Sequence, residues 1–145
     1  MDQATLVGRL ERAGEQLTAK LRDDPSFDLT ASFWWWNSES SAWLLVIASK
    51  NYERLGPKST YQHVRRLLKK LDTKRSSSPL DLSMISAVSA TDPRVAAMAS
   101  AISVSSGHAR VTRSNLNGVQ VDDALIYELS LAGVSSDAAE IPASA

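Results

Sequence analysis

The sequence predicts an α+β fold in which helices pack on a mainly antiparallel sheet of about five strands. Read along the chain, the apolar patterns give the order α-β-β-α-β-α-β-β, with paired β-like runs near both ends and helical patterns between strands in the middle. At 145 residues the chain is long enough to bury a core. We expect one domain over residues 1–133 and a flexible C-terminal tail over residues 134–145, because the tail is small and polar.

The first part of the chain predicts one helix and two strands. Residues 3–22 place leucine and alanine at spacings of three and four, which is typical of an amphipathic helix. Strands are expected at residues 33–36 and 43–48, joined by the polar turn "NSESS". Both runs are apolar on successive residues, so we expect the sheet to be covered on both faces here.

A second helix is predicted to begin after an N-cap at Ser59 or Thr60 and to bury a stripe that ends at Leu71. A third strand is expected over residues 80–90, "LDLSMISAVSA". A short helix follows, with Thr91 or Asp92 as its cap and Pro93 at the first helical position.

The pair Asn117-Gly118 between two β-like runs predicts a two-residue hairpin turn. That turn would set Leu116 opposite Val119, Thr112 opposite Asp123 and Arg113 opposite Asp122, the last as a cross-strand charge pair. Asp123 shares its strand face with an apolar row, so we expect it at a bulge or rim, bound to Thr112, to a backbone group or to solvent.

Four tryptophans lie within the stretch "ASFWWWNSESSAWLLVIASK". Successive residues of a strand point to opposite faces, so Trp35 would lie with Phe33 on one face and Trp34 with Trp36 on the other. Basic residues do not interleave with them as they do on a base-stacking platform. We therefore interpret the rings as a two-sided core; the alternative is that one face stays open to a partner chain.

Positive charge is concentrated in the middle of a chain whose formal net charge is zero. Residues 50–75 hold nine Lys or Arg and two acids, whereas the last 32 residues hold five acids and no Lys or Arg. On a helical wheel, the cations of the second helix lie opposite its apolar stripe. The predicted partner-binding residues are four cations of this helix and two that follow it in the sequence: Arg65, Arg66, Lys69, Lys70, Lys74 and Arg75.

These cations form a solvated face, a face paired with the acidic C-terminal region, or a surface that contacts an acidic partner. The hypothesis we favour is a non-catalytic accessory or interaction protein that binds another protein, or a second copy of itself, through the basic helix. The alternative is nucleic-acid binding by the same helix, although a pI near 6.7 is not typical of that class. We expect no membrane association, because the apolar side of the helix is needed for the core.

Catalysis is the third hypothesis. An enzyme would use His108 with Asp122 or Asp123, yet the hairpin register places His108 several residues from both aspartates. The chain has no cysteine and none of the common phosphate-loop, nucleophile-elbow or zinc-protease motifs. We therefore expect no catalytic residues, no metal and no cofactor, and we expect a cytoplasmic protein, because the N-terminus lacks the pattern of a signal peptide.

Overall fold

The computed structural model describes residues 8–71, 80–99, 109–116 and 118–129. It is an α+β structure with a five-stranded sheet, which confirms the predicted class and element order. The elements, in chain order, are α1 (Gly8–Arg22), β1 (Leu29–Asn37), β2 (Ala42–Ser49), α2 (Asn51–Leu71), a single 3-10 turn (Leu82–Met84), β3 (Ile85–Ser89), α3 (Pro93–Ala99), β4 (Ala109–Leu116) and β5 (Val119–Leu129). His108, Lys74, Arg75 and the predicted tail lie outside the described residues.

The strands lie in the order β3-β2-β1-β5-β4. The pairs β1–β2, β1–β5 and β4–β5 are antiparallel, and β2–β3 is parallel, because α2 carries the chain back between these two strands. The hairpin register is as predicted, with Leu116 paired with Val119 and Thr112 with Asp123. Gly118 has φ of 88°, a backbone conformation that glycine adopts without strain.

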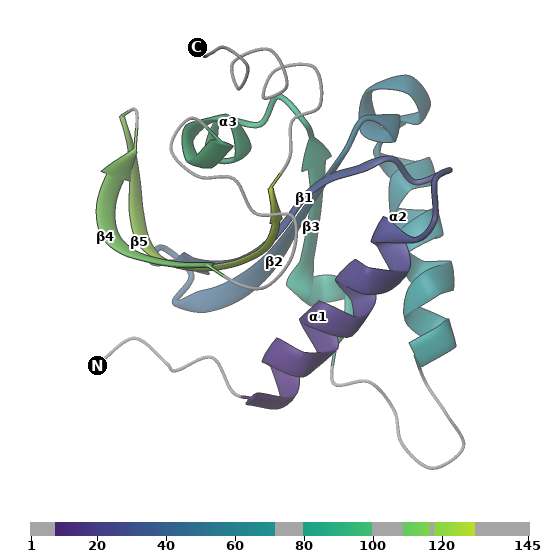
Figure 1. Cartoon of the computed structure of the whole chain (residues 1–145), viewed down its shortest axis with the longest axis horizontal. Coiled ribbons are helices and arrows are strands. Elements are labelled where there is room, and N and C mark those ends of the chain that lie inside the picture. The colour runs from purple at the N-terminus through teal and green to yellow at the C-terminus, as the bar shows by residue number, and fades with distance from the viewer. Residues whose placement is uncertain (1–7, 72–79, 100–108, 117, 130–145) are drawn as a thin grey trace, which may run out of the picture.

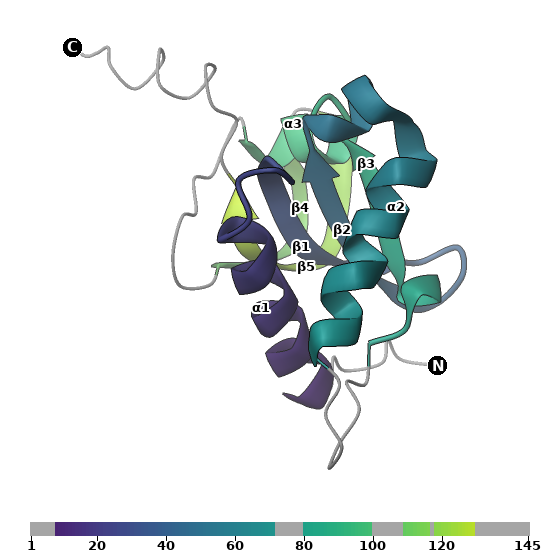
Figure 2. The ribbon, with the colours of Figure 1, turned by 90° about the vertical axis from the view of Figure 1, so that its right-hand side faces the viewer.

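Helices cover both faces of the sheet (Figures 1 and 2). Helices α1 and α2 lie side by side on one face, where Leu17, Leu21 and Val64 pack against Trp34 and sheet neighbours. The short helix α3 lies on the opposite face, over Phe33 and its neighbours. The successive apolar residues of β1 and β2 are therefore explained, since each face has its own core.

The tryptophan hairpin is core on both sides. Trp34 is fully buried under α1 and α2, whereas Phe33 is fully buried on the α3 face. The half-buried Trp35 lies beneath the guanidinium of Arg94, 5.7 Å from its ring centroid. Leu55 is the only large apolar side chain that is exposed among the described residues, so the described surface offers no aromatic platform.

Three predicted boundaries are wrong. Helix α2 spans Asn51–Leu71, but Gly56 (φ 87°, ψ 170°) is not helical and divides it in two; the second segment begins at Pro57, slightly before the start predicted from a cap at Ser59 or Thr60. The strand expected over residues 80–90 is shorter, because the side chain of Asp81 accepts a hydrogen bond from the Ser83 amide and caps a 3-10 turn before β3 begins. Strand β1 is longer than residues 33–36 at both of its ends.

Candidate partner-binding surface

The cations that the sequence singles out lie on the second segment of α2. The bend at Gly56 precedes Pro57, which takes the first helical position of this segment, where a missing N–H costs nothing. The hydroxyl of Thr60 then donates to the Gly56 carbonyl at 2.9 Å, which ties the first turn to the bend. The segment runs from there to Leu71 without a further interruption.

This segment separates apolar and positive side chains. Val64, Leu67 and Leu68 are buried against the sheet and α1, and each contributes about 1.5–3 kcal/mol to folding. On the opposite side four cations are exposed, and we call them the basic face: Arg65, Arg66, Lys69 and Lys70.

None of the basic-face side chains makes an ion pair or hydrogen bond with a described residue. Asp24, in the loop after α1, contacts α2 at His63, and its carboxylate is engaged there. Its carboxylate accepts two hydrogen bonds from Ser26, at 2.5 and 3.0 Å, and lies 2.8 Å from Nε2 of His63. Hydrogen bonds from Ser26 and then from His63 lower the pKa of Asp24 to about 2.

The acids of β5 do not neutralise the basic face either. Glu128 binds the guanidinium of Arg22 on α1 at 2.8 Å. Asp123 is held by Arg110 of β4 through two contacts of 2.5 and 2.7 Å. The interpretation that the acidic C-terminal region pairs with α2 therefore fails for these two carboxylates.

The predictions for Asp123 and its neighbourhood need correction. Asp123 is 7% exposed, and its carboxylate is held by Arg110, a partner that the sequence pattern did not indicate. Arg110 lies diagonally across from it on the same face, which is within reach of a long side chain. The predicted pair between Arg113 and Asp122 does not form, because Arg113 adopts a left-handed backbone with φ of 45°.

The described residues do not bring together the groups that the catalytic hypothesis requires. His108 lies outside the described residues, and the carboxylate of Asp123 is already engaged by Arg110. Across the described ranges, no three His, Asp or Glu side chains gather as a metal site would require. No helix in the described part of the chain is long and apolar enough to cross a membrane.

The sheet edges are poor sites for adding a strand from another chain. On β3, the Ala87 amide donates to the hydroxyl of Tyr61, so α2 already occupies part of that edge. On β4, Arg113 interrupts the extended backbone, and the Ser114 hydroxyl occupies the carbonyl of Thr112 at 2.9 Å. Such breaks and charges are the usual protection of an edge strand. They leave the helical face as the better candidate for contact.

One feature near the basic face was missed in the sequence. A shallow hollow between the C-terminal end of α1 and α2 brings Lys20 to the same depression as Lys70. Lys20 is distant in sequence from α2. The two helices pack antiparallel (Figure 2), and the shared lining of the hollow places Lys20 beside Lys70 of the basic face. A wheel drawn for one helix at a time carries no signal for this neighbour.

Comparisons of the chain with protein-family models, with curated proteins and with solved structures found no match.

Proposed function

We propose that this protein is a non-catalytic binding protein that contacts an acidic protein surface through Arg65, Arg66, Lys69 and Lys70. The observation that carries the proposal is that these four exposed cations have no carboxylate partner among the described residues. Like charges at helical spacing repel by a few tenths of a kcal/mol per pair. A contact with an external anion would offset that cost.

Three features favour polar contact with a protein over insertion into a membrane. The apolar side of α2 is buried in the core, so it is not free to enter a bilayer. The basic face is rigidly presented, because the helix beneath it is anchored by Val64, Leu67 and Leu68. Exposed charge of this kind speeds encounter with an oppositely charged surface and helps to select the partner.

Nucleic acid is the second candidate, since the same four cations would neutralise phosphates and release counterions. Two observations make us favour it less. The chain as a whole is neutral, with a pI near 6.7. In addition, the exposed carboxylate of Asp23 lies at the border of the basic face and would repel a continuous run of phosphates.

The two candidates are separated by a binding experiment with an oligoglutamate peptide and a short DNA duplex as probes. We expect oligoglutamate to bind at low salt and DNA to show little retention at physiological salt. The variant Arg66→Glu with Lys70→Glu should weaken oligoglutamate binding by about tenfold or more. Steeply salt-dependent DNA binding that the same variant abolishes would reverse the order of the candidates.

The matched control is Lys50→Glu with Arg113→Glu, which changes the net charge equally but leaves the basic face intact. If the control weakens oligoglutamate binding as much as the face variant, the attraction depends on total charge, and the proposal fails. Sedimentation of the unmodified protein shows whether a second copy is the partner, since association would then rise with protein concentration and disappear in the face variant.

A further inference from the structure

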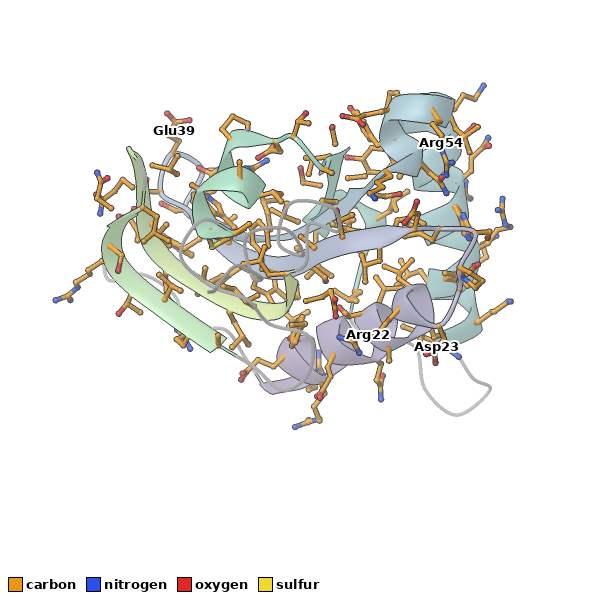
Figure 3. All side chains as sticks on the ribbon, turned by 45° about the horizontal axis from the view of Figure 1, so that its top comes forward. Arg22, Asp23, Glu39 and Arg54 are labelled. Atoms are coloured by element: carbon orange, nitrogen blue, oxygen red, sulfur yellow. The ribbon has the colours of Figure 1, made fainter. Side chains whose placement is uncertain are left out.

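The hollow between α1 and α2 has a volume of about 340 Å³ and opens to solvent beside the basic face. This is at the small end of ligand sites, which run from roughly 300 to 1,000 Å³. Figure 3 shows Asp23 at the end of α1, and Asp23 is one of the residues that line the hollow. The lining residues are Lys20, Asp23, Asp24, Pro25, Leu67 and Lys70.

Some charged groups that line the hollow already have binding partners in the protein, and others do not. Asp24 is occupied by Ser26 and His63, as described above. The ammonium groups of Lys20 and Lys70 are exposed and make no ion pair with a described residue. The hollow therefore holds two cations that come from different helices and are available to an anion.

We propose that this hollow receives one side chain of the acidic protein partner, an aspartate or glutamate whose carboxylate binds between Lys20 and Lys70. This inference rests on the proposed function and names the position on the surface where the partner is anchored. Leu67 is 7% exposed and gives the hollow an apolar wall, along which the methylene groups of such a side chain pack. A carboxylate between two ammonium groups forms charge-assisted hydrogen bonds with both.

Asp23 sets the selectivity of the hollow. Its carboxylate is exposed at the rim and repels any second anion that follows closely on the first. A protein carboxylate flanked by neutral residues avoids this repulsion, whereas a chain of phosphates or of adjacent glutamates meets it. The rim therefore favours a single carboxylate.

The test uses two acetylated and amidated peptides as probes. The first has one central glutamate flanked by neutral residues, with further glutamates at both ends to contact the basic face. The second consists of glutamates throughout. With the first peptide, Lys20→Gln and Lys70→Gln should each weaken binding about three- to tenfold. The double variant should lose less than the product of the two factors, because both lysines bind the same carboxylate. Asp23→Asn should strengthen the all-glutamate peptide more than the first peptide.

The control Lys50→Gln removes the same charge away from the hollow and should change binding less than twofold. If Lys20→Gln behaves like Lys50→Gln, or if the two lysine effects multiply fully, the hollow is not an anchoring position. A separate variant tests the proposed function. Arg65 and Lys69 belong to the basic face but do not line the hollow, so an unchanged peptide affinity in Arg65→Gln with Lys69→Gln would exclude the basic face as the contact surface.

Discussion

Gly14→Ala is the change that tests most sharply how α1 is locked onto the sheet. Gly14 is buried in the middle of α1. A β-carbon at this position would lie 2.6 Å from Nε1 of Trp34 and 3.0 Å from the ring and hydroxyl of Tyr127. Neither side chain has room to move, because Trp34 is fully buried and Tyr127 is 1% exposed.

The same two side chains form a buried hydrogen-bond chain that the new methyl group would disturb. Nε1 of Trp34 donates to the hydroxyl of Tyr127 at 3.1 Å, and that hydroxyl donates to the Glu11 carbonyl at 2.5 Å. Overpacking costs about 1–3 kcal/mol, and weakening the hydrogen bond costs about 1 kcal/mol more. Alanine regains about 1 kcal/mol of helix propensity. We therefore expect a net loss of about 1–3 kcal/mol.

Urea unfolding followed by tryptophan fluorescence measures this loss. Gly8→Ala is the matched control in the same helix, since its β-carbon would meet only the guanidinium of Arg12, at an ordinary 3.4 Å. The control should be neutral or should gain up to about 0.5 kcal/mol. Equal stability of the two variants would refute the packing of α1 against Trp34 and Tyr127.

Two further predictions concern ion pairs. Ser26 and then His63 favour the charged form of Asp24, whose pKa of about 2 lies below the usual 3.8. The charged Asp24 therefore makes its full contribution to the free energy of unfolding above pH 3.8 and loses it as the pH falls toward 2. In urea unfolding at several pH values, Asp24→Asn should lower the free energy of unfolding by about 1 kcal/mol near neutral pH and should flatten its dependence on pH. Arg110→Gln leaves Asp123 buried without its guanidinium partner and should lower the free energy of unfolding by about 1–2 kcal/mol. Adding Asp123→Asn should restore part of this loss. Unchanged stability in the single variant Arg110→Gln would contradict the pairing.

The local patterns that predicted the fold correctly are those whose cause is short-range. The sequence pattern Asn117-Gly118 predicted the β4–β5 register that the strands have, because a two-residue turn leaves only one way to align its flanking strands. Asp92 and Pro93 marked the start of α3, and the Asp92 carboxylate indeed accepts from the Arg94 amide at 2.9 Å. The apolar run of β1 predicted cover on both faces, which the two cores provide.

The start of α2 was misplaced because a short helical segment from Asn51 precedes the break at Gly56, and because the second segment begins at Pro57 and not after Ser59 or Thr60. Asn51 is 4% exposed, and its side chain bonds with the Ser26 carbonyl and Arg54, so tertiary contacts hold the short first segment in place. Residues 51–56 have no apolar periodicity, so the sequence pattern could not predict this helical segment.

The candidate site divides in the same way. A helical wheel places Arg65, Arg66, Lys69 and Lys70 away from the apolar stripe, because only the geometry of one helix is needed. The pairing of Arg110 with Asp123 depends on a diagonal between strands, and the approach of Lys20 depends on the packing of two helices. Such relations between elements are set by the whole fold, so they lie beyond what the sequence pattern contains.

Capture of partners from the native host, after nuclease treatment, is the measurement that tests the basic face most directly. We predict that the unmodified protein and the variant Lys50→Glu with Arg113→Glu retain a protein with an acidic surface, and that Arg66→Glu with Lys70→Glu loses it. The last variant should keep its stability within about 0.5 kcal/mol, because its changed residues are exposed and unpaired among the described residues. Equal retention by all three proteins would contradict the account.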